Sequence, residues 1–175
     1  MVYCFPGPIL EKNLKEMKDK VFVTNNFEET QNLGKEFAKT LRGGELVALY
    51  GNLGAGKTTF VQGLAMDLGI KRRIISPTFI IIKSYRIKFK TQKAKVKTTI
   101  QNSKIFYHID LYRMETAEDI RGLGIDEIIG NSNNIIVIEW AEKIKDFLPK
   151  ERIDIYFEYL DENKRKITVN KNNFQ

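Results

Sequence analysis

The sequence contains almost none of the residues that build disulfides or zinc sites. Cys4 is the only cysteine and His108 the only histidine, so neither an internal disulfide nor a Cys/His zinc cluster can form. Any metal ion must therefore rely on oxygen ligands. The chain also lacks an apolar run long enough to span a bilayer, and its N-terminus lacks a signal-peptide pattern. These absences predict a soluble, cytoplasmic protein that makes no contact with a membrane.

Acidic residues are missing from one segment. Residues 83–104 contain eight lysines or arginines and no acid, and without these eight charges the formal net charge of +7 becomes −1. The basic character is therefore local. No internal repeat or low-complexity linker interrupts the chain, so we expect one domain over residues 21–175. We expect residues 1–20 to form an N-terminal extension and residues 84–104 a basic insert.

Apolar periodicity predicts alternating helices and strands. The helical spacing predicts helices over residues 27–41, 60–68 and, as one or two short pieces, 118–129. The glycine pair at 43–44 would end the first of these helices. Short apolar runs predict strands over residues 46–50, 79–82, 105–109, 135–138 and 153–157, with an edge strand over 166–169. This alternation predicts an α/β protein with a mixed central sheet flanked by helices.

Residues 51–59, GNLGAGKTT, satisfy the pattern G-x-x-x-x-G-K-[ST]. The segment follows a predicted buried strand and opens a predicted helix, as a phosphate-binding loop must. Its glycines let successive N–H groups point inward, and the helix N-terminus adds a favourable dipole for an anion. The motif predicts a P-loop NTPase fold and a nucleotide site that includes Gly51, Asn52, Leu53, Gly54, Ala55, Gly56, Lys57, Thr58 and Thr59.

Two acids follow predicted strands and complete this hypothesis. In the P-loop pattern Lys57 reaches the β and γ phosphates and the Thr58 hydroxyl binds Mg²⁺. A neighbouring strand should then end in a carboxylate, and both Asp110 and Glu139 do so. Either acid alone could equally be a turn or cap residue. The two together beside a complete P-loop favour at least one magnesium ligand or water-orienting base.

Two weaker sequence signals concern the base and the γ-phosphate of the bound nucleotide. Guanine-specific P-loop proteins use an N-K-x-D segment, and neither Asn163-Lys-Arg-Lys nor Asn170-Lys-Asn-Asn carries the acid. ATP is therefore the expected nucleotide. The segment Ser76-Pro-Thr78-Phe79 offers a hydroxyl that could sense the γ-phosphate. A plain Ser-Pro turn explains it nearly as well.

The ordered set GNLGAGKTT, SPTF, HIDLYR and IEW, between about residues 24 and 160, closely resembles the TsaE (YjeE) family of bacterial ATPases. The resemblance implies an accessory ATPase for threonylcarbamoylation of the adenosine next to the anticodon in tRNAs reading ANN codons. It further implies ATP-dependent binding to, and resetting of, the complex of the transferase TsaD with TsaB. We expect turnover to be weak in the isolated protein and stimulated by these partners.

The resemblance also assigns roles to individual residues. It implies a catalytic set of Lys57, Asp110 and Glu139, with Thr58 and Glu139 as the magnesium ligands. Thr78 would be the switch residue, and Phe27 and Thr30 would lie near the base. We predict that His108 is structural, and that Trp140 and Arg113 are not essential to the chemistry.

The basic insert extends a predicted hairpin in which apolar and basic residues alternate. A tight turn at residues 91–92 would place Lys90 opposite Lys93 and Lys88 opposite Lys95, with the cations on one face. Like charges directly opposed are unfavourable, so one hypothesis is tRNA backbone contact. The alternative is a solvated arm or a lysine-protected sheet edge. The cations concerned are Arg86, Lys88, Lys90, Lys93, Lys95 and Lys97.

Two other functions remain open. A kinase of a small molecule or RNA could use the insert as a lid, and it would transfer phosphate to an acceptor. A nucleic-acid-binding protein with a non-catalytic P-loop would bind ATP without turnover, and Lys57→Ala would leave its RNA affinity unchanged.

Overall fold

The computed structural model describes residues 2–4, 20–72, 74, 81–87 and 104–171. These residues form one eight-stranded sheet in the order β1-β2-β8-β7-β3-β6-β5-β4. The strands are β1 (Val2–Cys4), β2 (Lys20–Thr24), β3 (Leu46–Tyr50), β4 (Ile82–Ile87), β5 (Lys104–Asp110), β6 (Ile135–Glu139), β7 (Ile153–Tyr159) and β8 (Arg165–Lys171). The sheet is mixed, because β5, β6, β3 and β7 run parallel whereas β4 and β8 pair antiparallel with their neighbours.

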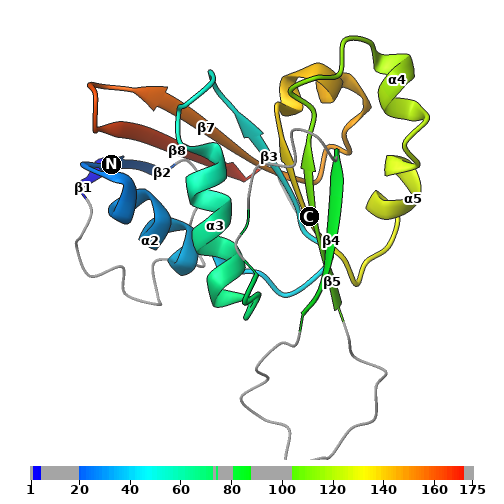
Figure 1. Cartoon of the computed structure of the whole chain (residues 1–175), viewed down its shortest axis with the longest axis horizontal. Coiled ribbons are helices and arrows are strands. Elements are labelled where there is room, and N and C mark those ends of the chain that lie inside the picture. The colour runs from blue at the N-terminus through cyan, green and yellow to red at the C-terminus, as the bar shows by residue number, and fades with distance from the viewer. Residues whose placement is uncertain (1, 5–19, 73, 75–80, 88–103, 172–175) are drawn as a thin grey trace, which may run out of the picture.

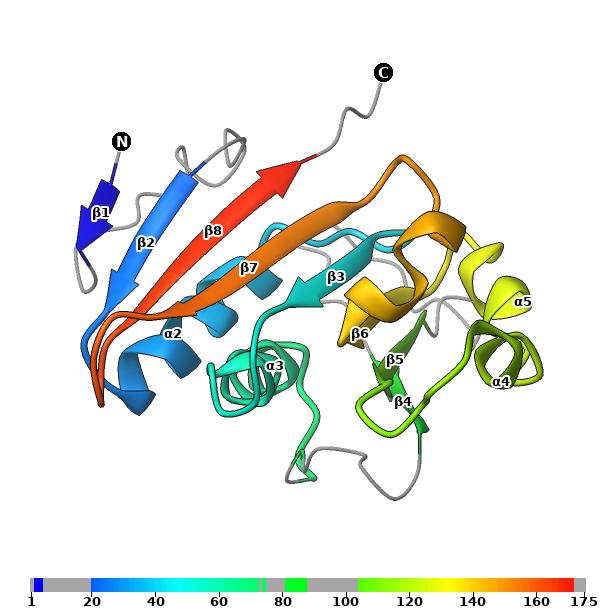
Figure 2. The same ribbon diagram turned by 90° about the horizontal axis from the view of Figure 1, so that it is seen from above.

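Helices cover both faces of the sheet (Figures 1 and 2). The helices α2 (Phe27–Ala38) and α3 (Lys57–Asp67) pack on the face to which Val47 and Leu49 point. The other face holds Ala48 and the short elements α4 (Ala117–Arg121), α5 (Ile125–Ile129) and η2 (Ala141–Phe147). Because β3 is enclosed by both layers, all five of its residues are buried. This explains its unbroken apolar sequence.

The two helices of the first layer approach each other closely. Asn26 caps α2 by accepting the backbone N–H of Glu29 at 2.8 Å. A Cβ atom on Gly34 would lie 2.1 Å from the carbonyl oxygen of Phe60, and one on Gly63 would lie 1.7 Å from that of Gln31. Only glycine at both positions permits this backbone contact, which fixes α3 and therefore the loop that precedes it.

The predicted mixed α/β sheet is confirmed, with corrections to individual elements. The first helix ends at Ala38 and not at residue 41, and Lys39 is its C-cap, so the glycine pair does not end it. The strand β8 lies between β2 and β7, so the prediction of an edge strand over residues 166–169 is wrong. The strand β2 was not predicted. Residues 2–4 of the predicted N-terminal extension pair in parallel with β2.

The C-terminal ends of the parallel strands lie together at one end of the sheet. Ligands bind at this end in open α/β folds. The glycine-rich loop follows β3 there, and Asp110 and Glu139 end β5 and β6. Asp110 pairs in register with Glu139, and Leu49 pairs with Glu139 from the other side. The two predicted acids are therefore neighbours beside the start of the loop.

The base of the predicted hairpin insert is a real antiparallel ribbon. Ile82 pairs with Ile109 and Ile87 with Lys104, so the ribbon begins in β4 and returns in β5. The predicted register is wrong for the described part. A turn at residues 91–92 would set position 86 opposite position 97, whereas Arg86 pairs with Ile105. The lysines between 88 and 97 lie outside the described residues.

Candidate functional site

A pocket of about 280 Å³ opens at the C-terminal ends of the parallel strands. Its lining comes from the glycine-rich loop, the first turn of α3, and the segments that follow β5 and β6. The lining residues are Leu53, Gly54, Ala55, Gly56, Lys57, Thr58, Thr59, Asp110, Tyr112, Glu139 and Trp140. The structure thus brings most of the residues predicted from the P-loop motif and both predicted acids into one cavity.

The loop has the backbone conformation that its glycines predict. Gly51 has φ 132° and Gly54 has φ 76°, in the region that side chains rarely adopt. Space is also lacking, because a Cβ on Gly51 would lie 2.4 Å from the carbonyl oxygen of Phe157. Gly56 is the N-cap of α3 and supplies no capping side chain. The first N–H groups of α3 are therefore free of a side-chain cap and suit an anion.

Lys57 is a buried cation in the wall of the pocket, with 4% exposure. Its Nζ donates to the carbonyl oxygens of Gly51 and Asn52 and lies 4.0 Å from the centroid of the Trp140 ring. Burial lowers the pKa of Lys57, and the carboxylates of Glu139, Glu142 and Asp110 oppose this effect. The carbonyl contacts hold the ammonium group at the mouth of the loop.

Thr58 and Glu139 form a pair suited to a hard cation. The Thr58 hydroxyl donates to Oε2 of Glu139 at 2.9 Å, and the other oxygen of Glu139 lies 2.7 Å from Nε2 of His108. Within the described residues no cluster of three or more His, Cys, Asp or Glu side chains could hold a metal. Mg²⁺ typically keeps several waters and takes only one or two protein ligands plus phosphate oxygens. The Thr58–Glu139 pair fits that requirement.

The segments that follow Asp110 and Glu139 contact each other beside the pocket. Its Oδ1 accepts the backbone N–H of Tyr112 at 3.0 Å, and the rings of Tyr112 and Trp140 lie 5.1 Å apart. Trp140 has φ 62°, the only positive φ of a non-glycine residue in the described chain. Lys143 donates to the carbonyl oxygen of Tyr112 at 2.5 Å. These contacts join the segment after β5 to the segment after β6.

The residues expected near the base have different environments. Thr30 is buried, and its hydroxyl lies 2.8 Å from that of Thr24. A Cβ atom added to Gly56 would lie 3.5 Å from the methyl group of Thr30, so Thr30 packs close to the glycine-rich loop. Phe27 is 52% exposed and is not among the pocket-lining residues. Thr78 lies outside the described residues.

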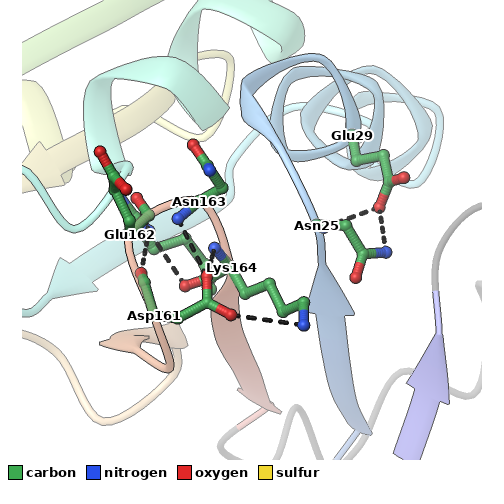
Figure 3. A network of polar contacts seen from close by, with 7 residues as sticks. Asn25, Glu29, Asp161, Glu162, Asn163 and Lys164 are labelled. Atoms are coloured by element: carbon green, nitrogen blue, oxygen red, sulfur yellow. Dashed lines mark hydrogen bonds and ion pairs between the residues drawn. The ribbon is translucent and has the colours of Figure 1, made fainter.

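The hairpin of β7 and β8 contributes contacts that sequence reasoning missed. The Tyr159 hydroxyl donates to the carbonyl oxygen of Leu53 at 2.9 Å, and the guanidinium of Arg165 lies 4.3 Å from the centroid of the Tyr159 ring. Tyr159 lies two residues beyond the predicted strand over residues 153–157, and no sequence pattern marked it as a contact of the loop. The turn beyond it is ordered by Asp161, which accepts the backbone N–H groups of Asn163 and Lys164 (Figure 3).

This turn lies beside the start of α2. Arg165 pairs in register with Thr24, and Asn25, the next residue, donates its backbone N–H to Glu29 at 2.8 Å (Figure 3). The glycine-rich loop is therefore flanked by the hairpin and by the N-terminus of α2. No helix in the described part of the chain is long and apolar enough to cross a membrane.

Comparison with known proteins agrees with this arrangement. The family model described as "Threonylcarbamoyl adenosine biosynthesis protein TsaE" matches residues 24–167. The "tRNA threonylcarbamoyladenosine biosynthesis protein TsaE" of Rickettsia prowazekii is 38% identical over 151 residues, which cover 86% of this chain and 94% of the relative. The protein of the same name from Bacillus subtilis is 38% identical over 152 residues, which cover 87% and 85%.

The fold agrees as well. The crystal structure of Bacillus subtilis YdiB superimposes with a TM-score of 0.67 at 32% identity, and the match covers 89% of this chain and 87% of YdiB. The predicted P-loop NTPase fold is thereby confirmed. The matched residues 24–167 include every segment that lines the pocket. The chain belongs to the TsaE family.

Proposed function

We propose that this protein binds Mg²⁺-ATP in the pocket and hydrolyses the ATP in support of threonylcarbamoylation of tRNA adenosine. The names of its relatives support the pathway. The observation that carries the nucleotide chemistry is the convergence, in one pocket, of Lys57 with the Thr58–Glu139 pair. The modified base would be the adenosine next to the anticodon in tRNAs reading ANN codons.

Lys57 and the loop would hold the phosphates. The Lys57 ammonium group donates to two loop carbonyl oxygens. When a triphosphate enters, phosphate oxygens replace these carbonyls as acceptors, and the buried cation gains a full counter-charge. The uncapped N-terminus of α3 contributes further N–H donors to the same anion.

Thr58, Glu139 and Asp110 would organise the reaction. Thr58 and Glu139 would hold Mg²⁺, which neutralises charge on the phosphate oxygens. Asp110 is the neighbour of Glu139 in register, and we assign it to orienting the attacking water. Water adds to the γ-phosphorus while the bond to the ADP oxygen breaks, so the products are ADP and phosphate.

The direct test measures ATP binding and hydrolysis by the purified chain. We expect Glu139→Gln and Asp110→Asn to lower the hydrolysis rate by about 100-fold or more, as loss of a catalytic acid or base usually does. Glu142→Gln is the matched control, because Glu142 is an exposed acid whose field also reaches Lys57. Its rate should stay within about threefold of wild type. Equal losses in all three variants would contradict the proposal.

The proposed partners are the TsaD and TsaB proteins, which the ATP cycle would bind and reset. We expect the purified chain to co-elute with a TsaD–TsaB complex when ATP and Mg²⁺ are present and to dissociate when they are removed. Partner addition should also raise the hydrolysis rate. Absence of co-elution under every nucleotide condition would contradict the partner proposal. The ATPase proposal would be unaffected, because the hydrolysis rates of the variants test it separately.

A further inference from the structure

His108 lies one diagonal step from Glu139 in the sheet. It is in β5, where it pairs in register with Val137 of β6, two residues before Glu139. Successive side chains of a strand alternate between faces, so His108 and Asp110 share one face of β5. The same alternation places Val137 and Glu139 on one face of β6. The histidine therefore reaches Glu139 from beneath the pocket.

The contact uses one carboxylate oxygen and leaves the other for the pocket. Nε2 of His108 lies 2.7 Å from Oε1 of Glu139, whereas Oε2 accepts the Thr58 hydroxyl at 2.9 Å. His108 is fully buried at 0% exposure and Glu139 has 2%. For the short contact to be a hydrogen bond to a carboxylate, the proton must be on Nε2.

The other ring nitrogen shows that the histidine serves this one contact. Nδ1 of His108 is buried and has no hydrogen-bond partner among the described residues. A buried polar atom without a partner costs about 1–3 kcal/mol. An apolar side chain at this position would avoid that cost, so the ring is not explained by packing alone. What the ring adds is the orientation of Glu139.

We propose that His108 is the positioning residue of the magnesium site: its Nε2–H holds Oε1 of Glu139 so that Oε2 faces Thr58 and the metal ion. This inference differs from the prediction that His108 is structural, and it rests on the proposed function. A side chain that orients a metal ligand from outside the coordination sphere commonly contributes about 10- to 100-fold in metal affinity.

A matched pair of substitutions separates positioning from packing. The amide nitrogen of glutamine can take the place of Nε2, whereas that of asparagine corresponds to Nδ1 and falls short of Glu139. We expect His108→Asn to raise the Mg²⁺ concentration that half-saturates Mg²⁺-dependent ADP binding by about 10- to 100-fold. His108→Gln should stay within about threefold of wild type, and both variants should bind ADP in EDTA like wild type.

A second measurement needs no variant. Because the chain has a single histidine, ¹⁵N-histidine labelling gives the signals of His108 alone. We expect the Nε2–H tautomer, and a shift of the Nε2 signal when Mg²⁺ is added to the ADP-bound protein but not when ADP is added in EDTA. A proton on Nδ1, or an unchanged Nε2 signal on Mg²⁺ addition, would overturn the inference.

The outcomes also distinguish this inference from the proposed function. Equal loss of Mg²⁺ affinity in the glutamine and asparagine variants, or equal loss of ADP binding in EDTA, would assign His108 to packing and overturn the inference. If wild-type protein binds nucleotide with no dependence on Mg²⁺, the proposed magnesium site itself fails. If His108→Asn does not fold, the ¹⁵N measurement decides.

Discussion

At the scale of single residues, Lys57 is a case in which a charge placed for ligand binding lowers the stability of the folded protein. Burial lowers the pKa of its ammonium group, so the unfolded chain binds this proton more tightly than the folded protein does. The buried ammonium group therefore lowers the free energy of unfolding. This effect is fully present below the lowered pKa and disappears as the pH rises towards the ordinary pKa of lysine. The position is thus suited to an anionic ligand, whose negative charge would offset this cost.

We therefore expect Lys57→Met to stabilise the ligand-free protein at pH 7 by about 1 kcal/mol while abolishing ATP binding, as substitutions in functional sites often do. The stability gain should shrink between neutral pH and about pH 10.5, where lysine loses its proton. Urea unfolding across this pH range measures both effects. Lys150→Met, at an exposed position, is the control. A Lys57→Met protein less stable than wild type at pH 7 would contradict this account.

The sequence predicted the residues of the loop but not their partners. The motif requires Lys57 and Thr58 at fixed spacing, and the strand ends identified Asp110 and Glu139. The contact of His108 with Glu139 depends on the register of β5 against β6, which no local pattern specifies. Phe27, the first residue of α2, is exposed and is not among the pocket-lining residues, and its assignment near the base came only from a loose resemblance of this segment to the family.

At the scale of secondary-structure elements, the hairpin of β7 and β8 supports the glycine-rich loop. Tyr159 reaches Leu53 across the loop, and a Cβ on Gly54 would lie 2.3 Å from the Tyr159 hydroxyl. The hairpin therefore touches the loop at the residues that precede Lys57. Arg165 stacks over Tyr159 and holds its ring.

We expect Tyr159→Phe to weaken ATP binding by about 2- to 10-fold, because it removes one hydrogen bond worth about 0.5–1.5 kcal/mol from the loop. Calorimetric titration with Mg²⁺-ATP measures the change. Glu158→Gln is the control, since Glu158 is exposed and pairs with Lys166 on the outside of the same hairpin. Unchanged ATP affinity in Tyr159→Phe would show that the hydrogen bond does not order the loop.

The packing of α2 against α3 is the second element-level determinant. We expect Gly63→Ala to destabilise the protein by about 3 kcal/mol, because its Cβ would lie 1.7 Å from the backbone oxygen of Gln31 and overpacking against backbone has no easy relief. Gly122→Ala should be neutral or stabilising, since its Cβ meets nothing closer than 3.7 Å. Thermal unfolding compares the two. Similar losses in both variants would contradict the argument.

The sequence patterns failed to predict those elements whose place in the sheet depends on pairing with distant segments of the chain. The buried strand β3 and the helix after the loop have strong apolar patterns, and both were predicted. The strand β8 has a weak pattern but lies inside the sheet, between β2 and β7. Its position depends on pairing with β2, a five-residue strand that was not predicted. Sheet order is a property of the whole chain, so it could not follow from these patterns.

At the scale of the whole molecule, the positive charge is concentrated in the basic insert, residues 84–104, most of which lies outside the described residues. At its described ends Ile87 pairs with Lys104, and Arg86 is exposed on β4. One hypothesis is that the insert contacts the phosphate backbone of tRNA, and the alternative is a solvated arm or a lysine-protected sheet edge. If the insert contacts tRNA, replacing six of its cations by glutamine will weaken tRNA binding and reduce the slope of log affinity against log salt by about 0.9 for each lost phosphate contact.

Filter binding of tRNA over a salt series tests this expectation. The insert variant changes Arg86, Lys88, Lys90, Lys93, Lys95 and Lys97. The matched control removes the same charge from other parts of the surface by changing Lys35, Lys71, Arg72, Lys145, Lys150 and Lys164. If only net charge mattered, both variants would lose affinity equally. A loss confined to the insert variant would place the tRNA contact in the insert, and unchanged affinity would support the alternative of a solvated arm or lysine-protected edge.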